Sequence, residues 1–156
     1  MRTENVLDYP RPAVCESVDL PVRIVFGGET IVDARDGVWR VLETYHPPTY
    51  YVPPFAIREG VLVPNGRRTI CEWKGQAGYF DVVVGDARAE GAAWTYRDPT
   101  PTFAGIRDHV AFYAEPMEAC FVGEERVIPQ PGNFYGGWLT ANIEGPIKGA
   151  PGTTHW

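Results

Sequence analysis

Paired cysteines and long apolar runs are absent from this chain of 156 residues. Its three cysteines, Cys15, Cys71 and Cys120, are far apart, and no Cys-x-x-Cys pair occurs. Neither a disulfide framework nor a four-cysteine zinc site is therefore expected. No apolar run reaches the roughly 18 residues of a membrane span, and the first five residues lack the charged-then-apolar order of a signal peptide. We therefore expect a cytoplasmic protein.

Stretches of positive charge are also absent. The chain has 14 Lys and Arg against 20 Asp and Glu, a formal net charge of −6. Nucleic acids and anionic membranes bind basic surfaces, so neither is an expected partner. The P-loop, Gly-x-Gly-x-x-Gly and Gly-x-Ser-x-Gly motifs are missing too. What remains is a small-molecule ligand as the possible partner, with no cofactor or oligomeric state indicated.

Glycine and proline are plentiful, with 17 and 15 residues spread along the whole chain. They separate short β-rich runs, and no stretch shows a long 3.6-residue apolar period. The Gly27-Gly28 pair between residues 22–26 and 29–33 predicts a hairpin, because tight hairpin turns need positive φ. We predict a mainly β, small single-domain antiparallel fold with little helix. The further strands are expected at residues 39–44, 50–52, 68–73, 79–84, 87–96, 110–114 and 119–127, with a short helix at 103–108.

Three parts of the chain differ in character. Residues 1–21 have little periodicity and are expected to form an extended N-terminal arm that lies on the domain. Residues 22–128 form the predicted β domain. Residues 129–156 are rich in Gly and Pro and are predicted to pack as a C-terminal tail on the same domain.

The first candidate cluster is Glu43, His46, Tyr50 and Tyr51. An imidazole, a carboxylate and two phenols are suited to proton transfer or to holding a polar ligand. We take Glu43 and His46 as candidate catalytic residues and the two tyrosines as candidate ligand-binding residues. The alternative is that His46 caps a loop and the tyrosine rings pack in the core.

The second cluster is Cys71, Trp73 and Lys74. The chain has only two lysines, Lys74 and Lys148, and each precedes a glycine. An ammonium can meet a phosphate or carboxylate as a point charge, so Lys74 is a third candidate catalytic residue. A nearby cation would lower the pKa of a Cys71 thiol and favour a nucleophile, whereas a buried inert cysteine is the alternative.

Aromatic residues supply the rest of the candidate site. Tyr79, Trp94 and Tyr96 are expected to line a pocket, although aromatic residues also fill β cores, as we expect for Trp39 and Phe112. No His or carboxylate pair has metal-ligand spacing, so no metal site is predicted. His109 and His155 are expected to be incidental.

Together these motifs resemble a widespread microbial family known as domain of unknown function 427, sometimes described as nucleotidyltransferase-like. The Trp-Lys-Gly and His-Pro-Pro-x-Tyr-Tyr segments are its most specific parts. The Phe-Tyr-Gly-Gly-Trp tail is similar to a longer subgroup. The resemblance implies a tent-like (Mss4-like) β fold, shared with B-type methionine sulfoxide reductases. The segments that carry it are residues 23–29, 42–44, 46–51, 71–75, 92–96, 109–113, 134–138 and 145–149.

The resemblance implies neither a metal site nor an established activity for this chain. Relatives with this fold often bear four zinc cysteines, and this chain lacks them, so neither their metal nor the reductase activity is expected. Nucleotidyl transfer normally needs paired carboxylates that hold a divalent metal at the phosphates. Asp33 and Asp36 flank a turn and Asp81 and Asp86 lie at opposite ends of a strand, so that activity is kept as a family label only.

Two hypotheses follow. In the first, the domain binds a small polar or anionic metabolite and acts on it or holds it. Lys74 would meet the anion, Glu43 and His46 would hold or move a proton, and the aromatic residues would form the walls. This hypothesis requires the clusters to converge in one pocket. In the second, the domain is a non-catalytic interaction or structural module whose Pro- and Tyr-rich segment or tail packs on a partner.

Overall fold

The hairpin signal at Gly27-Gly28 is confirmed in the computed structural model, which describes residues 1–132, 134–149, 152–153 and 156. Strand β3 (Val22–Phe26) pairs antiparallel with β4 (Glu29–Ala34). The two glycines have φ values of 60° and 78°. Positive φ at both turn residues matches the right-handed twist of the flanking strands, and glycine adopts it without steric cost.

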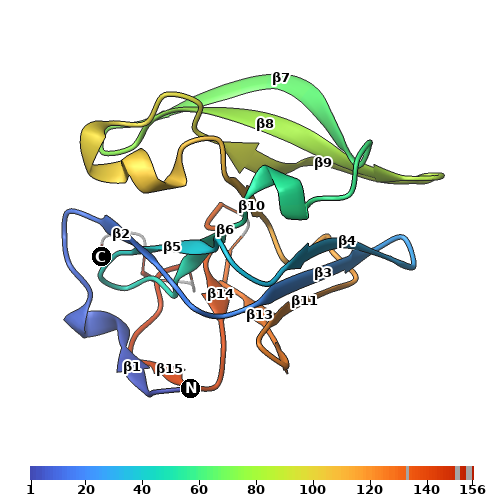
Figure 1. Ribbon diagram of the computed structural model, residues 1–156. Coiled ribbons are helices and arrows are strands. Elements are labelled where there is room, and N and C mark those ends of the chain that lie inside the picture. Colours follow the sequence, from blue (N-terminus) through green and yellow to red (C-terminus); the bar gives the residue numbers. More distant parts are fainter. Residues whose placement is uncertain (133, 150–151, 154–155) are drawn as a thin grey trace.

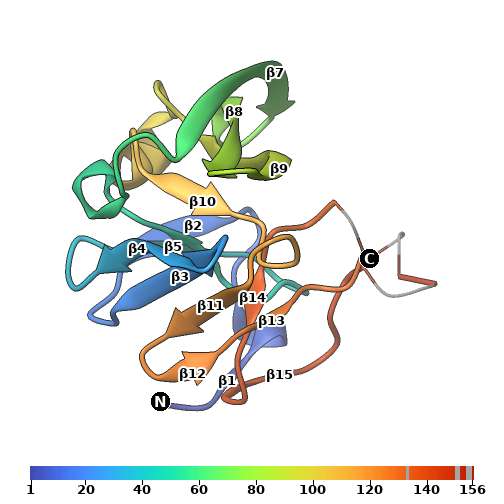
Figure 2. The ribbon, with the colours of Figure 1, turned by 90° about the vertical axis from the view of Figure 1, so that its right-hand side faces the viewer.

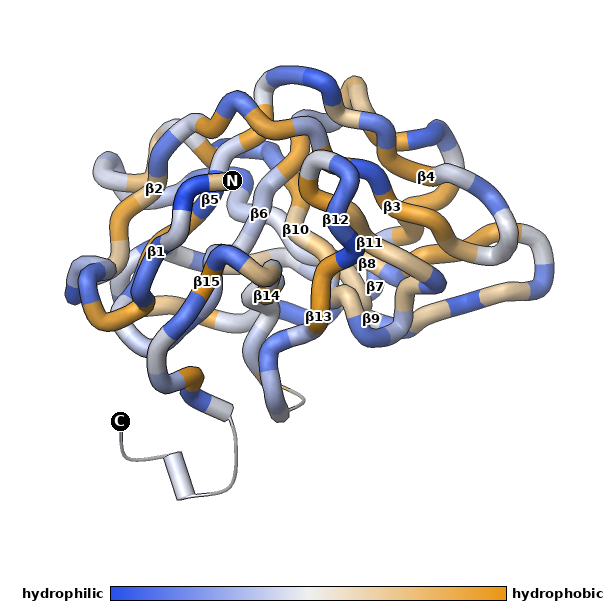
Figure 3. The backbone as a smooth tube through the Cα atoms, turned by 90° about the horizontal axis from the view of Figure 1, so that it is seen from below, coloured by the Kyte–Doolittle hydropathy of each residue, from blue (hydrophilic) through white to orange (hydrophobic). Residues whose placement is uncertain are grey.

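Strand β3 is at the centre of a four-stranded antiparallel sheet with the order β12-β11-β3-β4. Its other two strands are β11 (Ala119–Val122) and β12 (Glu125–Arg126). In β3, Val22, Ile24 and Phe26 are buried and alternate with more exposed residues, as expected for a strand with one face in the core. The apolar colouring of β3 is visible in Figure 3.

Two further sheets form the layer that supports the candidate site. One sheet has the order β10-β9-β8-β7 and the other β2-β5-β6, again with antiparallel neighbours. Their strands are β2 (Val14–Ser17), β5 (Trp39–Leu42), β6 (Thr49–Tyr51), β7 (Leu62–Cys71), β8 (Gly75–Val84), β9 (Ala87–Thr95) and β10 (Val110–Phe112).

These two sheets are joined at one point. Val52 and Val110 exchange two backbone hydrogen bonds, each with an N–O distance of 2.9 Å. The strands therefore follow one another as β2-β5-β6-β10-β9-β8-β7, which we call the joined sheet. Figures 1 and 2 show β10 between β9 and the β2-β5-β6 strands.

The remaining elements are short. The 3-10 helices are η1 (Val6–Asp8), η2 (Pro54–Ala56) and η3 (Pro101–Ile106). Strand β1 (Glu4–Asn5) pairs with β15 (Ile143–Glu144), and β13 (Ile128–Pro129) pairs with β14 (Trp138–Leu139). The expected arm thus supplies β1, η1 and β2, and the tail supplies β14 and β15. The three-part division itself stays a prediction.

Strand boundaries differ from the sequence prediction mainly in the β7–β8 hairpin. Strand β7 begins at Leu62 rather than at residue 68, and β8 begins at Gly75 rather than at 79. The register shifts between Pro64 and Arg68, so a bulge interrupts the alternating pattern there. Residues 75–78 have low β-propensity, and pairing with β7 rather than propensity makes them a strand.

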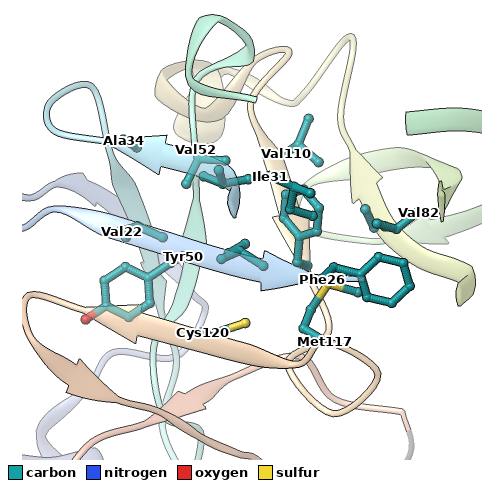
Figure 4. Packing of buried hydrophobic residues seen from close by; sticks show 14 of the residues in the cluster. Val22, Phe26, Ile31, Ala34, Tyr50, Val52, Val82, Val110, Met117 and Cys120 are labelled. Carbon is teal, nitrogen blue, oxygen red and sulfur yellow. The ribbon is translucent and has the colours of Figure 1, made fainter. Parts of the chain in front are cut away.

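The main core is between the first sheet and one face of the joined sheet. It contains Ile24 from β3, Tyr50 from β6 and Phe112 from β10. Figure 4 shows Tyr50 beside Val22 and Cys120 in this cluster. The prediction of a mainly β, antiparallel single domain with little helix is confirmed. Within the described residues, no helix is long and apolar enough to cross a membrane.

Candidate functional site

A cleft of about 360 Å³ is formed against the other face of the joined sheet. Its volume falls in the range of about 300–1,000 Å³ that is usual for small-molecule sites. Nine of the ten site residues selected from the sequence line it, from strands and turns far apart along the chain. They are Glu43, His46, Tyr51, Cys71, Trp73, Lys74, Tyr79, Trp94 and Tyr96.

Tyr50 is the residue that does not belong to this lining. Its side chain lies on the opposite face of the sheet, in the main core, with its ring centroid 5.6 Å from that of Trp138. Tyr50 and Tyr51 are consecutive residues of β6, and successive side chains of a strand point to opposite faces. The two tyrosines therefore cannot both face the cleft, and the structure places Tyr50 in the core and outside the cleft lining.

The floor of the cleft is aromatic. Strand β9 directs Trp94 into it, and this ring packs 4.6 Å from the ring of Tyr113 and 6.4 Å from that of Tyr79, measured between centroids. The indole Nε1 of Trp94 donates a hydrogen bond of 3.3 Å to the Tyr51 hydroxyl. Such rings give the floor a rigid, amphipathic surface that carries hydroxyl groups at its edge.

The hydroxyls of this floor differ in their partners. The Tyr79 hydroxyl is 3.0 Å from Thr69 Oγ1, and the Tyr113 hydroxyl donates to the carbonyl of Phe134 at 3.1 Å. Tyr96 is 5 % exposed, and its hydroxyl has no hydrogen-bond partner within the described part of the chain. Burial raises the pKa of both Tyr96 and Tyr51. Both phenols therefore stay protonated and can donate a hydrogen bond to a ligand.

The polar end of the cleft is built around His46. Its Nε2 lies 3.6 Å from Glu43 Oε2, and its Nδ1 lies 2.9 Å from the amide nitrogen of Gln130. Its ring packs edge-on against Tyr135, with centroids 5.0 Å apart. Burial lowers the pKa of His46 below its ordinary value, against the Glu43 carboxylate, which raises it. The imidazole is therefore neutral at physiological pH.

Two ammonium groups complete the lining. Lys74, at the β7–β8 turn, has its Nζ 5.7 Å from the centroid of the Phe103 ring, and it forms no ion pair with any described carboxylate. Lys148 has its Nζ 5.6 Å from the Tyr135 ring centroid and donates to the carbonyl of Trp156 at 3.1 Å. The lining therefore holds two cations, neutral donors and two carboxylates, Glu43 and Glu72. Because Lys74 is not paired with a described carboxylate, its ammonium can meet an anionic group.

The turn that carries Lys74 is held by the segment before η3. The amide N–H of Thr100 donates to the Lys74 carbonyl at 3.1 Å, and its hydroxyl donates to the Trp73 carbonyl at 2.5 Å. Cys71, at the end of β7, packs partly buried against the aromatic cluster. The structure favours the packing interpretation of this thiol, because among the described residues no base or cation forms a hydrogen bond or ion pair with it.

Sequence reasoning missed the contribution of the tail to the cleft. Gln130, Tyr135 and Gly136 line it, and so does Lys148, to which the sequence assigned no site role. The tail carries no regular pattern that would indicate which of its side chains face inward. Tyr113 was also missed, although its place after β10, beside Trp94 of β9, follows from strand pairing.

Metal-ligating side chains do not cluster in the part of the chain that the structure describes. There, no three His, Cys, Asp or Glu side chains are grouped as they would be to hold a metal ion. His109 does not line the cleft; its Nε2 lies 3.1 Å from the Gly37 carbonyl. His155 lies outside the described residues.

Comparison with known proteins bears on the family rather than on the chemistry. A search of curated proteins gives no match. The model of one protein family, described as Domain of unknown function (DUF427), matches residues 14–123. This range contains the sheets that form the floor of the cleft, whereas Gln130, Tyr135 and Lys148 lie beyond it. Since the match covers most of the sequence, the chain belongs to the DUF427 family.

Proposed function

We propose that the cleft binds a small polar metabolite that carries an anionic group. The observation that carries this proposal is the convergence of side chains from both sequence clusters on one cavity. Lys74 and His46 are 28 positions apart in the sequence, in the β7–β8 turn and the β5–β6 connection, and the hypothesis required them to meet. Lys74 is half-buried, forms no ion pair with a described carboxylate, and lines the same cavity as the His46-Glu43 pair.

The roles proposed for the lining follow from its chemistry. Lys74, with Lys148 as a second cation, attracts the anionic group, and the aromatic floor takes the less polar part of the ligand. Glu43 and His46 hold or move a proton at the polar end. If the protein is an enzyme, this pair is where proton transfer would occur.

Thermal-shift screening tests the proposal. Purified protein is heated with nucleotides, sugar phosphates, organic acids and divalent metals. A ligand at about 100 times its dissociation constant adds roughly 2.7 kcal/mol of stability. We expect an anionic compound to stabilise the wild type and to lose this effect in Lys74→Ala. Arg35→Ala removes one positive charge from an exposed position that does not line the cleft, and it should keep the response.

Either of two results would count against the proposal. One is the absence of a response to every compound class. The other is an equal loss of response in Lys74→Ala and Arg35→Ala, which would indicate a general effect of charge. A response that requires both a nucleotide and Mg²⁺ would make the nucleotide the ligand class and revive the nucleotidyltransferase hypothesis.

A second candidate function, an interaction module, is favoured by one observation. Ile70 and Phe134 lie at the rim of the cleft, and they are 82 % and 69 % exposed. Exposed apolar side chains beside a cleft are typical of surfaces that close on a partner. The Pro- and Tyr-rich segment does not support this function, because Tyr50, Tyr51 and Val52 are buried. Sedimentation of wild type and Phe134→Ser, compared over a range of concentrations, tests self-association.

The compartment, the excluded partners and the detailed fold type are proposals as well. We propose the cytoplasm as the compartment, supported by three free cysteines, Cys15, Cys71 and Cys120. The net charge of −6 supports the proposal that neither nucleic acid nor a membrane is a partner. The tent-like (Mss4-like) character of the fold remains a proposal that rests on the family resemblance.

A further inference from the structure

The side-chain amide of Gln130 has a fixed orientation at the polar end of the cleft. This residue is only 3 % exposed. Its Oε1 accepts a hydrogen bond from the Gly137 N–H at 3.1 Å, and its Nε2 donates to the Lys148 carbonyl at 2.8 Å. A backbone N–H only donates and a carbonyl only accepts, so these two bonds determine which end of the amide is nitrogen and which is oxygen.

The orientation of the amide determines where His46 carries its proton. The same Gln130 Nε2 lies 2.9 Å from His46 Nδ1. An amide nitrogen cannot accept a hydrogen bond, so Nδ1 is the acceptor and the neutral ring carries its proton on Nε2. At 3.6 Å from Glu43 Oε2, Nε2 is beyond hydrogen-bond distance of that carboxylate.

We propose that Gln130 is a positioning residue that holds His46 as the neutral Nε2–H tautomer, so that the cleft presents a hydrogen-bond donor beside the Glu43 carboxylate. The ligand atom that faces His46 is then an acceptor, such as a carbonyl or anionic oxygen. Glu43, and not His46, is the group that can take a proton. The statement about the ligand rests on the proposed function, whereas the tautomer does not.

Protonation of His46 is opposed by the same geometry. A second proton on Nδ1 would point at the N–H of the Gln130 amide and place two donors against each other. The other charged groups that face the ring are Glu43, Lys148 and Arg11. Burial and the two cations lower the pKa of His46, and the Glu43 carboxylate raises it. A hydrogen bond from a protonated ring to the Gln130 amide oxygen would also raise this pKa, but the bonds to Gly137 and Lys148 turn the amide nitrogen, not the oxygen, toward the ring. The donor state of Nε2 is therefore maintained across the physiological pH range.

The tautomer can be measured without any ligand. Long-range ¹H–¹⁵N correlation spectra of uniformly ¹⁵N-labelled protein distinguish a protonated ring nitrogen from an unprotonated one. The spectra are recorded above the ordinary histidine pKa of about 6.5, and the signals that disappear in His46→Asn are assigned to His46. We expect a protonated Nε2 and an unprotonated Nδ1. A wild-type spectrum with the proton on Nδ1, or with both tautomers populated, would overturn the proposal.

Two substitutions at position 130 test whether Gln130 is the cause. In Gln130→Glu, the carboxylate can accept from Nδ1–H and from the Gly137 N–H, so the proton should move to Nδ1 and the pKa of His46 should rise above the wild-type value. In Gln130→Met, which has similar volume and no hydrogen-bonding amide, the ring should populate both tautomers. An unchanged Nε2–H spectrum in both folded variants would contradict the role of Gln130. If neither variant folds, the wild-type spectrum still decides the tautomer.

The result separates this inference from the proposed function. A wild-type Nε2–H tautomer together with a screen in which no compound binds would leave the positioning role intact and remove the ligand. A compound whose binding depends on Lys74, together with the Nδ1–H tautomer, would support the proposed function and overturn the positioning role of Gln130.

Discussion

The joined sheet has two faces built from the same strands. The side chains of one face pack in the main core, and those of the other face line the cleft. On the core face, Ala93 and Phe112 pack against the first sheet as apolar groups with no polar function. On the cleft face, Tyr51 and Trp94 are just as deeply placed but carry hydroxyl and indole groups that face a cavity. Because successive side chains of a strand point to opposite faces, neighbouring residues of one strand belong either to the core or to the candidate site. Substitutions on the two faces should therefore have separable effects.

The largest expected effect is on the core face. Phe112 is 1 % exposed, and Phe112→Ala should lower the free energy of unfolding by about 3–5 kcal/mol, because it removes buried contacts and leaves a cavity. Urea denaturation measures this value. Tyr113→Phe, on the next residue and the opposite face, is the control and should lose far less. Similar losses in both variants would break the distinction between the two faces.

Close packing of the tail against the cleft should give the next largest effect. A Cβ added to Gly137 would lie 2.6 Å from Gln130 Oε1 and 2.6 Å from the Pro47 carbonyl oxygen. Gly137→Ala should therefore cost about 1–3 kcal/mol, as other overpacked sites do. Gly78→Ala is the matched control, because its nearest neighbour would be 3.6 Å away. Equal thermal midpoints for the two variants would show that the tail is free to move away from Pro47.

Two tyrosines of the cleft, Tyr51 and Tyr96, differ in whether their hydroxyl has a hydrogen-bond partner among the described residues. Tyr51→Phe removes the acceptor of the Trp94 Nε1–H bond and should cost about 1 kcal/mol. Tyr96→Phe removes a hydroxyl that has no partner among the described residues, so stability should hardly change, while any ligand that this hydroxyl contacts should bind more weakly. Denaturant midpoints test the first statement, and ligand titrations test the second. A large loss of stability in Tyr96→Phe would assign that hydroxyl to structure.

The smallest effect is the pH dependence that His46 contributes. Above the pKa of the unfolded chain, about 6.5, the imidazole is neutral in both states. As the pH falls through that value, the unfolded chain takes up a proton that the folded protein resists, because burial lowers the pKa of His46. The free energy of unfolding should therefore fall until the pH reaches the folded pKa.

His46→Asn provides the reference for this measurement. Its Oδ1 can still accept from the Gln130 amide, but it does not titrate. The free energy of unfolding of each protein is measured from about pH 8 to about pH 5. The wild-type value minus the variant value should decrease as the pH falls. A constant difference would mean that the pKa of His46 is the same in both states.

The sequence predicted the fold class and the clustering better than the details that depend on long-range contacts. The glycine pair at 27–28 identified its hairpin because the turn chemistry is local. The His46 and Lys74 clusters were recognised from residue types, and their convergence depended on the joint at Val52 and Val110, which no local pattern indicates. Tyr50 and Tyr51 were selected together from the sequence as adjacent aromatics, whereas strand alternation puts them on opposite faces of the joined sheet.

The tail was the part of the candidate site that the sequence concealed. Gln130 follows the two residues of β13 and precedes a Gly- and Pro-rich stretch, where no periodicity assigns a face. Its three hydrogen bonds reach Gly137, Lys148 and His46, and none of these partners can be inferred without the fold. Single-sequence patterns predict elements and compositional clusters, whereas buried polar contacts between distant segments are set by tertiary structure.

The contact between Gln130 and His46 also has a consequence for the order in which the molecule is assembled. It spans 84 positions, and the backbone bond from the Lys148 N–H to the Tyr45 carbonyl closes an even longer loop. During synthesis, β3 to β10 are made before residue 130, so their strands can begin to pair while the cleft still lacks one side. Contacts of such high sequence separation are late and slow steps of folding. The cleft is therefore among the last parts of the newly made chain to be completed.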